Sequence, residues 1–292
     1  MAEHGEERAM IREHRAMPLA DGFVFLEGPR WHDGALWVSD MWGHEVLRVT
    51  EDGRRETICA VPGRPSGLGF LPDGTPLVVS MEDRRVMRIV DGELTLHADL
   101  TELAGGDCNE MIVDGAGRAY VGNFGYDLFG GATPAKADLL IVEPDGRAHV
   151  AAAAMEFPNG MTLVEEGRML VVAESWAGRL IAFDRHADGS LSHRRVFAGL
   201  GERSPDGICV DARDGVWVAC YDTNEFIRVR EGGAITDRVP VGDRHAIACM
   251  LGGEDGRTLF CCTFAGDFGA MGSGARNAAI ETVRVDVPAP GF

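Results

Sequence analysis

FPNGMTLVEEGRMLVVAES, residues 157–175, is the clearest copy of a unit that recurs along this chain of 292 residues. Its two short apolar segments, residues 161–163 and 170–173, are separated by the polar sequence Glu-Glu-Gly-Arg. Short apolar runs divided by a tight, glycine-containing turn are typical of a β-hairpin. A third apolar run follows at residues 180–183, so the unit continues into a further strand.

The unit occurs six times, and its copies begin roughly 40–50 residues apart, the length of a four-stranded propeller blade. Each copy has its own turn before its second strand, and the 39 glycines of the chain suit so many turns. The copies align on one residue at the start of each first strand, which we call the opening column. Its members are Glu27, Ser66, Asn109, Asn159, Asp206 and Ala246.

The last copy lacks a fourth strand, because the chain runs after residue 287 into Pro-Ala-Pro-Gly-Phe. The apolar segment at residues 14–25 precedes the first copy and has no sheet of its own. Pairing between the two would close a ring and remove two open sheet edges. We therefore predict an all-β, six-bladed β-propeller of four-stranded blades, closed by an N-terminal strand that completes the last blade. Residues 14–292 would form this single domain, after a flexible arm at residues 1–13.

Composition restricts the partners and the compartment. The net charge of −18, without clusters of Lys and Arg, argues against a non-specific nucleic-acid binder. No run reaches the ~18 apolar residues of a membrane span, and residues 1–15 lack the apolar segment of a signal peptide. The seven scattered cysteines show neither a disulfide framework nor a zinc spacing. We expect a cytoplasmic protein with reduced thiols that binds neither nucleic acid nor membrane, and the oligomeric state stays open.

The opening column carries the candidate chemistry. First strands line the channel of a propeller, so column residues should form a ring at one mouth. Two carboxylates and two amides among them suit a hard cation, Ca²⁺ first and then Mg²⁺ or Mn²⁺. Asn-Gly and Asp-Gly also favour turns, but each copy already has a separate turn, which favours the ligand interpretation. The members with a carboxylate or amide oxygen, called the oxygen-bearing members below, are Glu27, Asn109, Asn159 and Asp206.

Two insertions, residues 123–137 and 264–277, should overhang the same mouth and shape a pocket. Residues that follow the second strands return to this face of the ring and are pocket candidates. His245 precedes the last opening and is either a catalytic base or a loop residue. The expected substrate-binding residues are Asn109, Asn123, Tyr126, Trp176, Tyr221 and His245.

Several motifs, including Glu27-Gly-Pro-Arg-Trp, Phe-Pro-Asn159-Gly-Met and Pro-Asp206-Gly-Ile, together resemble one family over most of the chain. This is the family of senescence marker protein, gluconolactonase and luciferin-regenerating enzyme, six-bladed propellers that include metal-dependent lactonases. The resemblance implies one divalent ion held by Glu27, Asn159 and Asp206, with Asn109 beside the substrate or in the coordination shell. Sugar lactonases of the family commonly carry an arginine two residues before the Asn109 position. Here that residue is Asp107, which argues against a gluconolactone-type substrate.

We predict a divalent-metal-dependent hydrolase of a small-molecule lactone or ester, of the EC 3.1.1 class. The ion would polarise the carbonyl while Asp206 acts as general base on water, with His245 the alternative base. Fe²⁺ and Zn²⁺ stay alternatives to the ions above. A propeller enzyme of the strictosidine-synthase or paraoxonase type and a non-catalytic cation-binding scaffold are the competing functions. An oxygen-rich column beneath overhanging loops favours the hydrolase, because a scaffold has no need of it.

Overall fold

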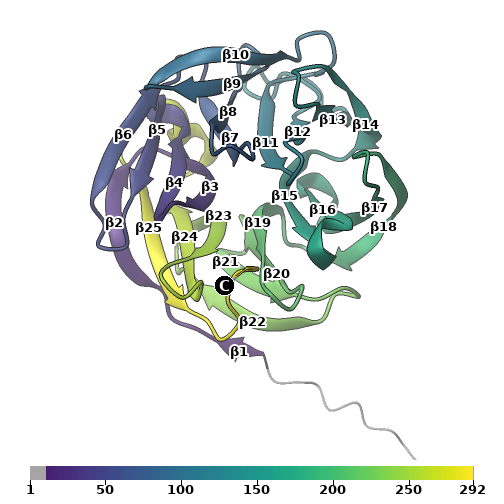
Figure 1. The fold of residues 1–292 in the computed structure, drawn as a ribbon. Coiled ribbons are helices and arrows are strands. Elements are labelled where there is room, and N and C mark those ends of the chain that lie inside the picture. The colour runs from purple at the N-terminus through teal and green to yellow at the C-terminus, as the bar shows by residue number, and fades with distance from the viewer. Residues whose placement is uncertain (1–10, 292) are drawn as a thin grey trace, which may run out of the picture.

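Six β-sheets surround a central channel in this computed structural model, which describes residues 11–291 (Figure 1). Each of the first five blades contains four consecutive antiparallel strands, with the first strand innermost. The predicted six-bladed propeller is therefore confirmed. Blades one to three contain β3 (Leu26–His32), β4 (Ala35–Asp40), β5 (Glu45–Val49), β6 (Arg55–Ala60), β7 (Pro65–Phe70), β8 (Pro76–Ser80), β9 (Arg85–Val90), β10 (Glu93–Asp99), β11 (Cys108–Val113), β12 (Ala119–Asn123), β13 (Ala137–Val142) and β14 (Ala148–Met155).

Blades four and five contain β15 (Pro158–Val164), β16 (Met169–Glu174), β17 (Arg179–Arg185), β18 (Leu191–Gly199), β19 (Pro205–Val210), β20 (Val216–Cys220), β21 (Glu225–Val229) and β22 (Ile235–Pro240). The helices of the described chain are short 3₁₀ turns, and none has the length or hydrophobicity of a membrane-spanning helix. They are η1 (Met41–Gly43), η2 (Glu165–Gly167), η3 (Ser175–Ala177) and η4 (Phe268–Ser273).

The N-terminal segment closes the ring as predicted. Blade six is built from β23 (His245–Gly252), β24 (Thr258–Phe264), β25 (Ala278–Arg284) and β2 (Met17–Phe23). Strand β2 runs antiparallel to β25, with Met17 opposite Thr282 and Phe23 opposite Ala278. Residues 1–10 of the predicted arm lie outside the described residues. Arg12 and Glu13, also expected in that arm, instead form strand β1, which pairs in parallel with the outer strand β22.

The blades pack through side chains that alternate along each strand. In β16, Leu170 and Val172 join the apolar cluster shared with blade three, whereas Val171 and Ala173 join the cluster shared with blade five. Successive side chains of a strand point to opposite faces, so a strand covered on both faces is apolar throughout. This explains why residues 170–173 form a continuous apolar run.

Every inner strand is bulged at the opening column. The pairing of the first and second strands shifts register there in all six blades. A bulge bends the strand and re-aims the side chain at that position. The inner strands also approach closely, because a Cβ at Gly160 would collide with the carbonyl oxygen of Asp206. The glycine that follows the column residue is thus required by strand packing.

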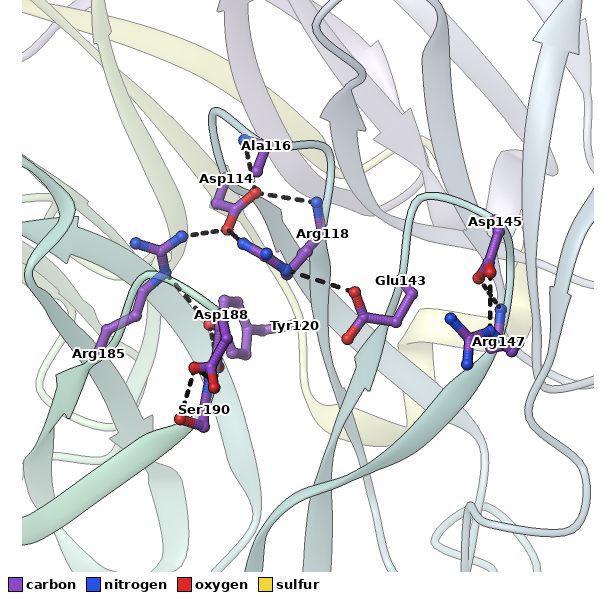
Figure 2. Close-up of polar contacts among 11 residues, drawn as sticks. Asp114, Ala116, Arg118, Tyr120, Glu143, Asp145, Arg147, Arg185, Asp188 and Ser190 are labelled. Carbon is purple, nitrogen blue, oxygen red and sulfur yellow. Dashed lines mark hydrogen bonds and ion pairs between the residues drawn. The ribbon is translucent and has the colours of Figure 1, made fainter.

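A network of ion pairs joins blades three and four at the far ends of these strands (Figure 2). Asp114 follows β11 and accepts hydrogen bonds from the backbone N–H groups of Ala116 and Arg118, at 2.8 and 2.9 Å. The same carboxylate contacts the guanidinium groups of Arg118 and Arg185, the latter from blade four. The hydroxyl of Tyr120 donates to the carbonyl oxygen of Gly189 at 2.6 Å. These bonds fasten adjacent blades to each other.

Candidate functional site

The four oxygen-bearing column residues meet at the floor of one cavity of about 190 Å³. Each comes from a different blade and stands at the bulge of its inner strand. The side chains of Glu27, Asn109 and Asn159 are buried, and Asp206 is partly buried. The bulges thus bring two carboxylates and two amides together from positions far apart in the sequence.

A chain of hydrogen bonds fixes the orientation of the two amides. Asn109 Nδ2 donates to Asn159 Oδ1 at 3.1 Å, and Asn159 Nδ2 donates to Ser175 Oγ at 3.2 Å. Ser66, another column member, donates to Asn109 Oδ1 at 3.2 Å, and Ser175 donates to the carbonyl of Pro205 at 2.7 Å. An amide oxygen has two lone pairs, so both asparagines can still bind a cation.

Each of the two carboxylates on the floor has one buried oxygen without a partner. Glu27 Oε2 and Asp206 Oδ1 are buried and accept no hydrogen bond. Burial, and then the charges of Asp206 and Glu110, raise the pKa of Glu27 well above its ordinary value. Burial and the charge of Glu110 raise the pKa of Asp206 to about 8. Buried carboxylates are costly unless they are paired or bind a metal, so this floor fits a divalent cation with oxygen ligands.

A cluster of three or more His, Cys, Asp or Glu side chains that could hold a metal is absent among residues 11–291. The floor has a different composition, because amides supply two of its four donor side chains. Glu110, the third carboxylate nearby, contacts Arg30 Nη2 through Oε2 at 3.0 Å, while its Oε1 is buried and unpaired. The donor set is therefore two carboxylates and two amides, the composition expected from the column.

One side of the cavity is bordered by an aromatic wall, which we define as the rings of Trp42, Phe129, Phe124, Phe157 and Trp176; all but Trp42 line the cavity. Successive ring centroids along this series are 5.4, 5.8, 4.8 and 4.6 Å apart. Phe157 has a left-handed backbone with φ of 61°, a conformation that costs a bulky residue roughly 1–3 kcal/mol. Strain of this kind gathers at binding sites, and here it accompanies a ring at the centre of the wall.

Of the expected substrate-binding residues, Asn109, Trp176 and Tyr221 line the cavity. Burial, together with the charges of Asp206 and Asp222, raises the pKa of the Tyr221 hydroxyl to about 12, so it stays a hydrogen-bond donor at neutral pH. Trp176 Nε1 donates to the hydroxyl of Tyr126 at 3.0 Å. Tyr126 supports the wall from behind and is not itself among the lining residues.

Asn123 and His245 lie outside the cavity lining. The amide of Asn123 donates to the carbonyl of Asp138 at 2.8 Å and accepts from the N–H of Gly125 at 3.0 Å, which anchors the first insertion. The His245 ring stacks on Tyr221 at 4.2 Å, and its Nδ1 lies 3.0 Å from the Tyr221 carbonyl oxygen. Both residues position groups that line the cavity.

The apolar lining was not identified residue by residue from the sequence. Both insertions supply part of this lining, as their length suggested, and their apolar composition was the signal available in the sequence. These lining residues are Phe124, Leu128 and Phe129 of the first insertion and Met271 of the second.

Asp107 forms an ion pair that the sequence did not reveal. Its Oδ2 lies 3.0 Å from Arg64 Nη2, and Arg64 also contacts Glu82 at 3.0 Å. The Arg64 guanidinium packs over the rings of Trp42 and Phe129, 4.5 Å from each centroid. Arg64 lies two residues before Ser66 of the opening column, just as Asp107 lies two residues before Asn109 in the next blade. This shared position was the signal available in the sequence.

Comparison with known proteins gives consistent results. The family described as SMP-30/Gluconolactonase/LRE-like region matches residues 25–265. Pentonolactonase XacC of Haloferax volcanii is 28% identical over 277 residues, 91% of each chain, and regucalcin of Danio rerio is 26% identical over 248 residues, 80% of this chain and 81% of that one. The crystal structure of a calcium-binding protein, regucalcin, from Agrobacterium tumefaciens superposes with a TM-score of 0.81 at 21% identity, covering 96% of this chain and 97% of that one. At this identity the last comparison shows the fold alone.

Proposed function

We propose that this chain, which belongs to the SMP-30/gluconolactonase/LRE-like family, is a divalent-metal-dependent lactonase of the EC 3.1.1 class. A relative named as a pentonolactonase matches it over nearly its whole length, which supports lactone hydrolysis. The observation that carries the proposal is the pair of buried, unpartnered oxygens, Glu27 Oε2 and Asp206 Oδ1, at the floor of a cavity. Such oxygens are unfavourable for folding and are explained by a bound cation.

Glu27, Asn159 and Asp206 would hold the ion, with Asn109 beside the substrate or in the coordination shell. A bound divalent ion supplies Lewis-acid polarisation of the lactone carbonyl and stabilises the charge that develops on its oxygen. Ca²⁺ is our first choice because all the donors are hard oxygens. Mg²⁺, Mn²⁺, Fe²⁺ and Zn²⁺ are the ions to test against it.

The carboxylate of Asp206 has two oxygens, so it can be both a metal ligand and a general base. One oxygen would face the ion, and the other would take a proton from the water that attacks the carbonyl carbon. The ring C–O bond then breaks, the proton passes to the leaving alkoxide oxygen, and a hydroxy acid is released. General base catalysis of this kind is worth roughly 10²–10⁴-fold. The Asn109–Asn159–Ser175 hydrogen bonds keep the floor in one geometry throughout.

The test is a lactone panel assayed after chelation and after return of each metal separately. We expect the chelated protein to be inactive and one ion to restore turnover. A protein that remains active while atomic analysis finds no bound ion would contradict the metal dependence. Absence of turnover for every lactone with every ion would contradict the hydrolase.

A further inference from the structure

We propose that the lactone substrate carries an apolar substituent, which lies along the aromatic wall while the lactone ring sits on the floor. This inference rests on the proposed function and names its substrate class. It distinguishes this chain from an enzyme for polyhydroxylated sugar lactones. Three observations carry it: the continuity of the wall, the shortage of free donors, and the side of the cavity on which the polar groups lie.

The wall is continuous, and four of its five rings, all but that of Trp42, line the cavity. Its rings run in contact from Trp42 to Trp176, and the side chains of Leu128 and Met271 extend the apolar lining. Trp176 keeps 52% of its surface exposed at the end of this series. A contiguous apolar surface inside a pocket favours a ligand that removes it from water.

Hydroxyl groups of a sugar would find few partners beside this wall. Among the described residues that line the cavity there is neither a lysine nor an arginine. The nearby guanidinium of Arg64 packs over Phe129 and pairs with Glu82 and Asp107. Its Nη1 is buried without a partner, and Arg64 is not among the lining residues. A hydroxyl buried without a partner weakens binding, so the wall selects against polyols.

Three donors of the lining residues are also engaged. Ser175 donates to the carbonyl of Pro205, Ser204 donates to Asp222, and Trp176 Nε1 donates to Tyr126. What remains polar is the floor and the side formed by Tyr221 and Asp222. The cavity therefore has a polar floor and one apolar side, which matches a ligand with a polar head and an apolar tail.

The test compares γ-nonanolactone, whose five-carbon tail extends an otherwise identical ring, with γ-butyrolactone and with glucono-1,5-lactone. Each methylene removed from water is worth about fourfold in binding. Burial of three of the five carbons predicts a kcat/KM for γ-nonanolactone about 60-fold above that for γ-butyrolactone. We expect glucono-1,5-lactone to be the poorest of the three after correction for its spontaneous hydrolysis.

A non-hydrolysable probe separates binding from catalysis. The lactam 5-pentylpyrrolidin-2-one keeps the tail and replaces the ring ester by an amide. Titration calorimetry with the metal-supplemented protein should show binding at least ~30-fold tighter than that of pyrrolidin-2-one. Leu128→Asn should reduce this ratio by about tenfold or more. Leu96→Asn is the matched control, because Leu96 is 56% exposed on the outer strand β10.

The outcomes distinguish the two proposals. A tail preference in lactam binding that Leu128→Asn weakens, without turnover of any lactone, would support the wall and contradict the hydrolase. Turnover in which glucono-1,5-lactone equals or exceeds γ-nonanolactone would support the hydrolase and overturn the apolar substrate. Equal binding of the two lactams would also overturn it. If Leu128→Asn fails to fold, Met271→Gln on the second insertion repeats the comparison.

Discussion

Strand β19 carries an aspartate at each end, and the two have opposite surroundings. Asp206 opens the strand at the cavity floor with an unpartnered oxygen. Asp211 follows the strand at the other end of the channel, where both its oxygens bind the guanidinium of Arg228. The same contrast separates the cavity floor from Asp114, whose carboxylate binds two backbone N–H groups and two arginines (Figure 2).

The pKa values follow this contrast. Burial raises the pKa of Asp114, but hydrogen bonds from the Arg118 backbone and from Arg185 outweigh it, and the net shift is downward. Asp206, equally an inner-strand aspartate, has its pKa raised to about 8. Paired carboxylates stabilise the ring, whereas unpaired carboxylates cost stability and prepare a ligand site. On the inner strands, the unpaired oxygens of Glu27 and Asp206 thus lie at the cavity end, whereas the paired carboxylates of Asp114 and Asp211 lie at the other end.

The largest effect should come from Asp114→Asn. It leaves the partly buried Arg185 without its counter-charge, while Arg118 keeps only Glu143, so we expect a loss on the order of 3 kcal/mol in the free energy of unfolding. The measurement is urea denaturation of wild type and variant. Because the folded pKa of Asp114 is lowered, its stabilisation is present above the ordinary value and lost as pH falls through the folded one. The difference between the two proteins should therefore shrink below about pH 4.

The activity of Asp114→Asn, assayed below its unfolding range, should stay within about twofold of wild type. An unchanged stability would show that the network in Figure 2 contributes nothing. A large loss of kcat with normal stability would contradict the proposal that Asp114 contributes to stability and not to catalysis.

Asp206→Asn should show the reverse behaviour. The variant keeps an oxygen donor and nearly the same shape but cannot accept a proton, so kcat should fall at least ~10²-fold without rescue by excess metal. This loss corresponds to about 2.7 kcal/mol. The metal-free variant should be no less stable than wild type, because the substitution removes an unpaired buried charge. Recovery of kcat at high metal would leave Asp206 as a ligand only and would direct the search for the base to His245.

Saturation of the cavity site with the metal ion should stabilise the folded protein by mass action. At one hundred times its dissociation constant the ion should add about 2.7 kcal/mol to the free energy of unfolding. Thermal melting with and without chelator measures the increment. Asp114→Asn should show the same increment as wild type, since its site lies at the other end of the strands. An ion that fails to raise the melting temperature would contradict binding at the floor.

Glu27→Gln should have the smallest effect of the four. We expect it to weaken metal affinity and lower the rate about tenfold at limiting metal, with partial recovery when the ion is in excess. The readout is the rate as a function of metal concentration for Glu27→Gln and Asp206→Asn side by side. Identical metal dependence in both variants would show that the two carboxylates are equivalent.

The sequence predicted the ring because its signal is local and repeated. Turn pairs and apolar runs set six blades, and the missing last strand indicated closure by residues 14–25, which β2 confirms. Family membership, first suggested by motifs such as Phe-Pro-Asn159-Gly-Met, is confirmed as well. The joint position of the four oxygen donors followed from the same alignment of copies.

What the sequence did not predict depends on tertiary contacts. The left-handed backbone of Phe157 and the partnership of Arg64 with Asp107 have no local pattern. His245 and Asn123 were expected in the pocket from chain position, but whether a residue lines a cavity or supports its wall is decided by neighbouring side chains. The pairing of β1 with β22 likewise joins segments distant in the chain.

Because β2 pairs with β25, the ring can close only after nearly the whole chain has been synthesised. Met17 pairs with Thr282, a partner 265 residues later in the chain. At translation rates of ~5–20 residues per second the first strand to leave the ribosome waits on the order of tens of seconds for the last. During this time the β2 segment, and the face of blade one that packs against blade six, are open to other chains. The β2 segment therefore stays without its partner strand while the first five blades are made one after another, and chaperones would act during this interval.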